Sequence, residues 1–165
     1  MLGPDNAIWD DGEWLTWADV NSHLYQLEMG ERFPNADAAL VETFRDLLDV
    51  AQQYFYQTGK HLQVYGDLGE LFGAITYGIR LNKNYAQGSD GRLGKDHVEV
   101  KTITPFKTND TVQLNLERNF NKVFIVRISE DFEIEAKMID RKSLPKNKSK
   151  RLQLRWSTID TLLAA

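Results

Sequence analysis

The sequence predicts a mixed α/β protein, α+β-like in arrangement, in which a mixed β-sheet is flanked by helices. Apolar residues recur at helical spacing in the first 60 residues, whereas alternating or continuous apolar runs typical of strands follow residue 96. The chain has 165 residues, 42% hydrophobic and 27% charged, which fits one soluble globular domain. We expect a single domain over 1–165, made of a helical N-terminal segment (1–60), a core (61–140) and a basic loop with a terminal helix (141–165).

Two helices are expected in the N-terminal segment. Thr16 is in position to cap a helix that runs to about Leu27, with Asp19 at the capping-box position. An amphipathic helix over about 36–58 should follow, ended by Gly59. One side of the first helix holds an apolar stripe, Trp17, Val20, Leu24 and Leu27. We expect this stripe to belong to the hydrophobic core.

A third helix is expected from about residue 66, and it carries Glu70. Its buried stripe is Leu68, Leu71, Phe72, Ile75 and Ile79. Glycine costs a helix roughly 1 kcal/mol relative to alanine, yet four interrupt this segment, Gly66, Gly69, Gly73 and Gly78. We therefore expect another backbone to approach the helix closely, and a narrow flank beside Glu70.

A tight hairpin is predicted at residues 93–96, Leu-Gly-Lys-Asp, with glycine at the first central position of a type II′ turn. Counting outward from this turn places Asp90 opposite Glu99, with Lys101 on the same face. Two adjacent carboxylates repel each other, and a hard divalent cation such as Mg²⁺ or Mn²⁺ would remove that repulsion. The alternative is an ordinary hairpin with a solvated charged face, on which Lys101 neutralises Glu99.

Three further strands and a terminal helix complete the expected fold. The strand that carries Glu99 should end at Pro105, and 111–116 should be half-buried. Residues 123–128 are apolar enough for a central strand buried on both faces, and 132–138 resembles a charged edge strand. Residues 141–155 are interpreted as a basic loop, followed by a helix capped by Ser157.

The order of these acidic and basic residues resembles the PD-(D/E)XK nuclease superfamily. A helical glutamate, an aspartate and a Glu-x-Lys across a hairpin match Glu70, Asp90, Glu99 and Lys101. Ser89 stands where the family has its name-giving proline. Asp96 is the other candidate acid, but the hairpin register puts it on the face opposite Glu99, so Asp90 is preferred. The resemblance covers about residues 60–140 and implies a restriction-endonuclease-like core.

The resemblance implies a Mg²⁺-dependent (or Mn²⁺-dependent) DNA endonuclease that acts in restriction, defence or repair. In this interpretation Asp90, Glu99 and the backbone carbonyl of Val100 bind the metal. Lys101 orients the attacking water, and Glu70 supports the metal shell. Many members of the family cut both strands as dimers, so the resemblance is compatible with a homodimer.

Charge is distributed unevenly along the chain. The net charge is −4, but residues 1–90 hold 5 basic and 14 acidic residues whereas residues 91–165 hold 15 basic and 10 acidic. Residues 141–155 hold 7 basic residues and no acidic one, which favours phosphate contacts made by counterion release. The candidate nucleic-acid-binding residues are Arg141, Lys142, Lys146, Lys148, Lys150 and Arg151. The alternative is a solvated basic loop.

Composition excludes several other classes. There is no cysteine, so disulfides and thiolate metal sites are excluded, and three scattered histidines lack zinc-ligand spacing. No signal peptide and no apolar run of roughly 18 residues is visible, so a soluble cytoplasmic protein without a membrane partner is expected. Two other functions fit the sequence: a non-catalytic nucleic-acid-binding or protein-interaction module on the same fold, and an acidic N-terminal surface that inhibits a basic partner.

Overall fold

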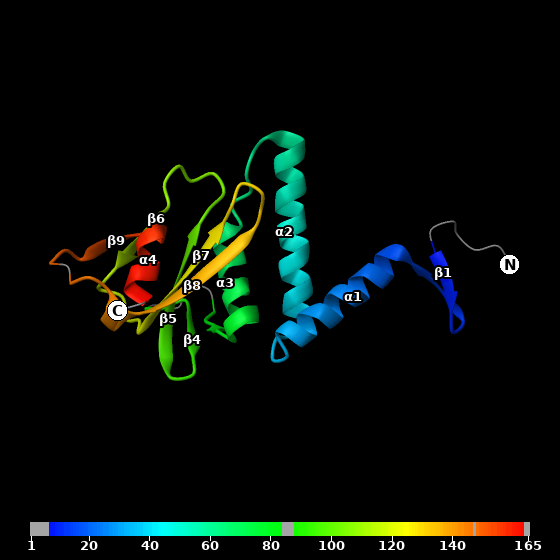
Figure 1. Ribbon diagram of the computed structural model, residues 1–165, viewed down its shortest axis with the longest axis horizontal. Helices are drawn as coiled ribbons and strands as arrows, with labels where there is room; N and C mark the ends of the chain where they lie inside the picture. The colour runs from blue at the N-terminus through cyan, green and yellow to red at the C-terminus, as the bar shows by residue number, and fades with distance from the viewer. Residues whose placement is uncertain (1–6, 84–87, 147, 164–165) are drawn as a thin grey trace.

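The predicted mixed α/β architecture is confirmed. The computed structural model describes residues 7–83, 88–146 and 148–163, and it places a five-stranded mixed sheet between helices on one face and a small two-stranded sheet with a helix on the other (Figure 1). The main sheet has the order β3-β4-β5-β7-β8, in which only β5 and β7 run parallel. Its strands are β3 (Arg80–Leu81), β4 (Gly91–Leu93), β5 (Asp96–Ile103), β7 (Lys122–Ile128) and β8 (Ile134–Asp140).

An N-terminal arm leads away from the sheet. It consists of a hairpin, β1 (Ala7–Asp10) with β2 (Glu13–Thr16), and of α1 (Trp17–Arg32) (Figure 1). The predicted capping box is confirmed, because the Thr16 hydroxyl accepts a hydrogen bond from the Asp19 N–H and the Asp19 carboxylate accepts one from the Thr16 N–H. The hairpin itself was not expected from the sequence.

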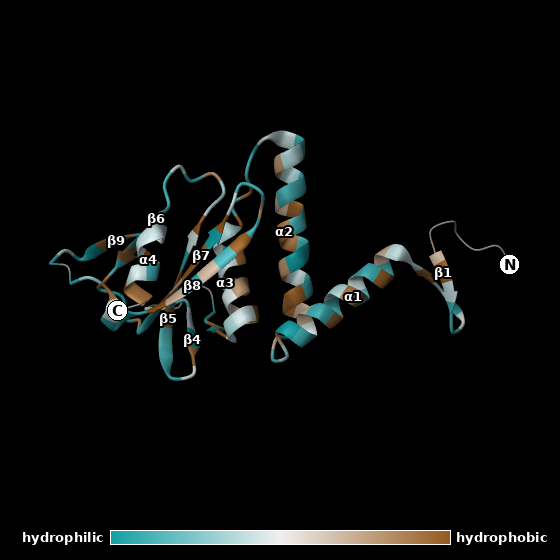
Figure 2. Cartoon of the chain, viewed as in Figure 1, coloured by the Kyte–Doolittle hydropathy of each residue, from teal (hydrophilic) through white to brown (hydrophobic). Residues whose placement is uncertain are grey.

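The predicted core role of the α1 stripe is wrong. No residue of α1 is buried, and Trp17, Leu24 and Leu27 are 56%, 57% and 52% exposed. The reason is geometric: α1 reaches the rest of the protein with its other side, where Tyr25 and Met29 pack against the core. Figure 2 shows hydrophobic residues along α1 as well as in the sheet.

Helix α3 (Tyr65–Tyr77) packs on one face of the sheet against β5 and β7, and α2 (Ala38–Thr58) packs against α3. Gly59 ends α2 in a left-handed conformation with φ 67°, as predicted. The expected close approach to α3 is made by side chains and not by a backbone. A Cβ at Gly69 would overlap Oγ1 of Thr102, and one at Gly73 would lie 2.9 Å from atoms of Ile79 and Phe124. Open space surrounds the other two glycines of this segment.

Strand β7 is buried on both faces, as its apolar sequence predicted. Phe124 and Val126 belong to the core shared with α2 and α3, whereas Val123 and Ile125 belong to a second core on the opposite face. Strand β8 is an edge of the main sheet, as its charged sequence predicted. It begins two residues later than expected.

The second core is covered by a small sheet and a helix. Strand β6 (Thr111–Asn115) pairs with β9 (Arg151–Arg155), and α4 (Trp156–Leu163) follows. The predicted continuous basic loop is therefore wrong: it begins as a short 3-10 helix, Arg141–Ser143, and ends as β9. Leu152 and Leu154 alternate with exposed polar residues and are buried. Helix α4 already begins at Trp156, so Ser157 lies inside it and does not cap it.

Within the described part of the chain, no helix is both long enough and apolar enough to cross a lipid bilayer.

Candidate active site

The β4–β5 hairpin brings Asp90 beside β5, although not by the predicted pairing. Gly94 has φ 61°, and the register is confirmed as far as the Gly91–Val98 pair. Beyond it, the Asp90 N–H donates to the Val98 carbonyl at 3.0 Å, so Asp90 leaves the ladder before it can face Glu99. Its Oδ2 instead accepts a hydrogen bond from the Val100 N–H at 2.7 Å. Asp90 is thus fixed to the strand by its carboxylate.

Ser89 and Asn82 hold the backbone around Asp90. Ser89 is buried, and its Oγ lies 3.1 Å from Nδ1 of His97. The Asn82 amide donates to the Ser89 carbonyl at 2.9 Å, and the Asn82 N–H donates to the Asp90 carbonyl at 2.9 Å. Polar contacts therefore fix the backbone of this segment next to Asp90.

Glu99 is the most unusual residue of the site. Its side chain is 1% exposed, and its Oε1 accepts a hydrogen bond from Lys101 Nζ at 2.6 Å. Its Oε2 is buried, and it has no hydrogen-bond partner in the part of the chain that the structure describes. Burial of a carboxylate is costly unless each oxygen is satisfied. The interpretation of this face as a solvated charged surface is therefore wrong for Glu99.

Arg118 lies between the two acids, and sequence reasoning missed it. Its guanidinium donates to Glu99 Oε1 at 2.7 Å and to Asp90 Oδ1 at 3.3 Å, while its Nε donates to the Gly88 carbonyl at 3.0 Å. Arg118 comes from the loop between β6 and β7, where no periodicity indicates the direction of a side chain. The available signal was indirect: two neighbouring carboxylates require a cation nearby.

Glu70 reaches the same group of charges from α3. Its side chain is partly buried, and this burial raises the pKa of its carboxyl group above the usual range. The neighbouring charge of Asp90 raises the pKa further, with smaller contributions from Asp67 and Glu99, whereas Lys101 lowers it. The structure therefore brings Glu70 within electrostatic range of the other three predicted site residues.

These side chains include the ligand types that a hard cation prefers, but they are not arranged as a complete coordination site. The ligand types are carboxylates, as Mg²⁺ prefers, and Oε2 of Glu99 has an unused pair of acceptor positions in a buried place. Among the described residues, however, no three His, Cys, Asp or Glu side chains converge closely enough to form a ready-made metal site. In this conformation the guanidinium of Arg118 joins Asp90 and Glu99.

The predicted nucleic-acid-binding residues fall into two groups. Arg141 turns inward: its guanidinium donates to the carbonyls of Leu116, Arg118 and Phe120, and it stacks on the Phe120 ring. Lys150 pairs with Glu117 at 2.6 Å. The other members are exposed, Lys142, Lys146, Lys148 and Arg151. Arg141 and Lys150 thus attach the basic segment to the loop that carries Arg118.

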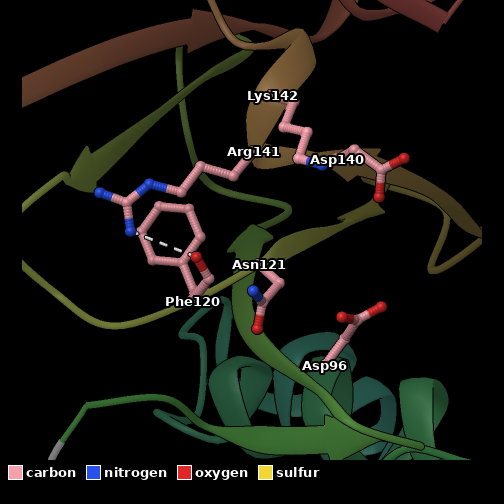
Figure 3. A pocket seen from close by; sticks show the side chains of 6 residues that line it. All are labelled: Asp96, Phe120, Asn121, Asp140, Arg141 and Lys142. Atoms are coloured by element: carbon pink, nitrogen blue, oxygen red, sulfur yellow. Dashed lines mark hydrogen bonds between the residues drawn. The ribbon is translucent and has the colours of Figure 1, made fainter.

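A hollow with a volume of about 530 Å³ lies beside this loop (Figure 3). Figure 3 shows Arg141 extended over Phe120, with the carboxylates of Asp96 and Asp140 on the opposite part of the lining. Asp96, the second candidate acid of the sequence, pairs there with Lys122 at 3.7 Å. Hydrogen bonding to Asp140 raises the pKa of the Lys122 ammonium. Asp96 therefore belongs to a separate charge cluster.

Neither protein-family models nor curated proteins include a match to this chain. The function is therefore inferred from the side chains themselves.

Proposed function

We propose that this chain is a cytoplasmic, Mg²⁺-dependent DNA endonuclease with a core of the PD-(D/E)XK type. The observation that carries the proposal is the state of Glu99. A carboxylate that is almost completely buried, with one oxygen saturated by cations and the other without a partner, costs the fold stability. A divalent ion bound to that oxygen would offset the cost, so the arrangement is explained by function more readily than by stability.

Each residue of the site has a role in this proposal. Asp90, Glu99 and the carbonyl of Val100 would hold the metal, which when bound polarises a phosphoryl oxygen and lowers the pKa of a bound water. Lys101 is fixed by its hydrogen bond to Glu99, so its ammonium group can orient the water and stabilise the negative charge of the transition state. Glu70 keeps its proton more readily than an exposed glutamate does, and it would support the waters around the metal.

The basic segment supplies the attraction for nucleic acid. Lys142, Lys146 and Lys148 are exposed and can contact phosphates. Each phosphate contact releases a counterion, so affinity should fall steeply as salt concentration rises. Arg141 connects this segment to the Arg118 loop, so nucleic acid that lies along the lysines would be brought towards the acidic site.

The proposal is tested with a matched pair of lysine variants. Lys101→Ala should abolish Mg²⁺-dependent cleavage of plasmid DNA while the protein stays folded and keeps its DNA affinity. Lys95→Ala removes an exposed lysine from the turn of the same hairpin, and it should cleave as the wild type does. Normal cleavage by Lys101→Ala would show that the assignment of Lys101 is wrong.

The metal site is tested separately by calorimetric titration with Mn²⁺. The wild type should bind the ion, and Asp90→Asn and Glu99→Gln should each remove that binding because each removes a negatively charged ligand. Retained binding in both variants would contradict the assignment of these two acids.

A second function is favoured by one specific observation. Arg118 already neutralises both Asp90 and Glu99, as expected for a non-catalytic nucleic-acid-binding or protein-interaction module that has lost its metal. Such a module should bind DNA equally well with EDTA and with Mg²⁺, and its DNA affinity should tolerate Asp90→Asn. An endonuclease should bind DNA with different affinity in EDTA and in Mg²⁺, and Asp90→Asn should change its DNA affinity.

A further inference from the structure

The guanidinium of Arg118 lies between the two carboxylates of the candidate site, Asp90 and Glu99. One guanidinium spans both acids, with one nitrogen on Glu99 Oε1 and the other on Asp90 Oδ1. Lys101 also donates to Oε1 of Glu99, so two positive groups share one oxygen while Oε2 has none. This uneven arrangement indicates that the guanidinium satisfies the acids only in part.

We propose that Arg118 is an internal counter-ion that a divalent cation displaces. The inference rests on the proposed metal-dependent function, and it adds a positioning residue that the family resemblance does not assign. Arg118 thereby keeps Asp90 and Glu99 together when no metal is bound. The same residue lowers the affinity of the site for the metal, because the ion must displace it.

The charge balance supports displacement. The two negative charges of Asp90 and Glu99 face the two positive charges of Lys101 and Arg118. Addition of a divalent ion would leave the site with excess positive charge at close range, where like charges repel strongly. Departure of Arg118 reduces that excess, whereas departure of Lys101 would take away the group that orients the water.

The surroundings of Arg118 allow its side chain to move while its backbone stays in place. The side chain is 31% exposed, so solvent is within reach of the guanidinium. The backbone is fixed by Arg141, which donates to the carbonyl of Arg118 at 2.9 Å and to that of Phe120 at 3.2 Å. Rotation about side-chain bonds therefore suffices.

The test is a calorimetric titration of the full chain with Mn²⁺ in the absence of nucleic acid. Arg118→Met removes the competing cation, so Mn²⁺ should bind more tightly, by about 5- to 150-fold for a coupling of ordinary size. Arg45→Met is the matched control: Arg45 also pairs with a carboxylate, that of Asp49, but on the surface of α2. It removes the same charge and should leave the Mn²⁺ affinity unchanged.

Three results would overturn the inference, and they have different meanings. Equal Mn²⁺ affinity in the wild type and Arg118→Met would reject displacement while leaving the metal site in place. Weaker binding by Arg118→Met would show that Arg118 only holds the acids in position. No Mn²⁺ binding by any of the proteins would reject the metal site of the proposed function, and displacement with it.

A measurement on the wild type avoids dependence on the folding of a variant. The Nε–H group of Arg118 donates to the Gly88 carbonyl, so its ¹⁵N–¹H signal reports whether the side chain stays in the site. Saturation with Mg²⁺ should shift this signal towards that of a solvated arginine. A signal that stays unchanged while Mg²⁺ binds would contradict displacement.

Discussion

Helices α1 and α3 have similar apolar stripes in the sequence but opposite environments in the structure. The stripe of α3 packs on β5 and β7, with Leu68 fully buried, whereas Leu24 of α1 is 57% exposed. Periodicity identifies the side of a helix that is apolar, but it contains no information about whether the same chain covers that side. Two glycines of α3 also distinguish the helices, because side chains of the sheet lie where a Cβ at Gly69 or Gly73 would be.

The largest difference between the two helices should appear when leucines are shortened. Leu68→Ala should lower the free energy of unfolding by about 2–5 kcal/mol, since it leaves a cavity in the core. Leu24→Ala should change it by less than about 0.5 kcal/mol, as is usual for surface positions. Urea denaturation monitored by circular dichroism measures both. Similar losses in the two variants would mean that the α1 stripe is covered in solution.

Glycine-to-alanine substitutions should have opposite signs in the two helices. Gly69→Ala should destabilise the protein by about 1–3 kcal/mol, because the added methyl group overlaps Thr102. Gly30→Ala lies in α1 with nothing within 4 Å of the new atom. It should stabilise α1 by about 0.5–1 kcal/mol because alanine favours the helix. Thermal denaturation gives the sign for Gly69→Ala, and helicity at 222 nm gives it for Gly30→Ala. Lower helicity in Gly30→Ala would contradict the open environment of α1.

Much of the fold was predictable because local rules specify it. The capping box at Thr16, the end of α2 at Gly59 and the double-sided burial of β7 each depend on residues close in sequence. The strand β9 was missed since its basic residues hide a two-residue alternation of Leu152 and Leu154. The basic residues of this segment led to the prediction of a loop, whereas the burial of its alternate leucines favours a strand.

The site was predictable in composition but not in geometry. The turn at Gly94 gave the register of the hairpin to Gly91, and that was enough to bring Asp90 near Glu99. It did not show that Asp90 leaves the ladder. Arg118 could not be found, because the contact of a loop residue with an acid 19 positions earlier depends on how separate elements pack.

Loss of the helix cap should be a smaller effect, confined to the arm. Thr16→Ala removes the hydroxyl that accepts from the Asp19 N–H, and it should destabilise α1 by about 1 kcal/mol. Because α1 has no buried residue, the loss should appear as lower helicity at 222 nm with an unchanged midpoint of thermal unfolding. Asn21→Ala, an exposed position inside α1, serves as the control and should not reduce helicity. A lowered midpoint for Thr16→Ala would show that the arm and the core unfold together.

The smallest expected effects are pH-dependent, and they have opposite signs in the two helices. The pKa of Glu70 on α3 is raised by burial and by the charge of Asp90. The native state therefore keeps this proton longer than the unfolded chain does, and stability is lost as pH rises above the unfolded value of about 4.3. Glu70→Gln removes this loss, so its stability relative to the wild type should increase between pH 4 and pH 7.5 in urea denaturation.

Asp19 on α1 shows the reverse. Hydrogen bonds from Thr16 lower the pKa of its carboxyl group, so its stabilisation of α1 is present above the unfolded value of about 3.9 and is lost as pH falls through the lower native value. Asp19→Asn should therefore reduce helicity at pH 7 and leave it nearly unchanged at pH 2. Opposite pH dependences in the two variants would establish that the folded protein disfavours the charged form of Glu70 and favours the charged form of Asp19. Equal pH dependences would mean that the folded protein favours the charged form of Glu70 as it does that of Asp19, which would contradict the raised pKa of Glu70.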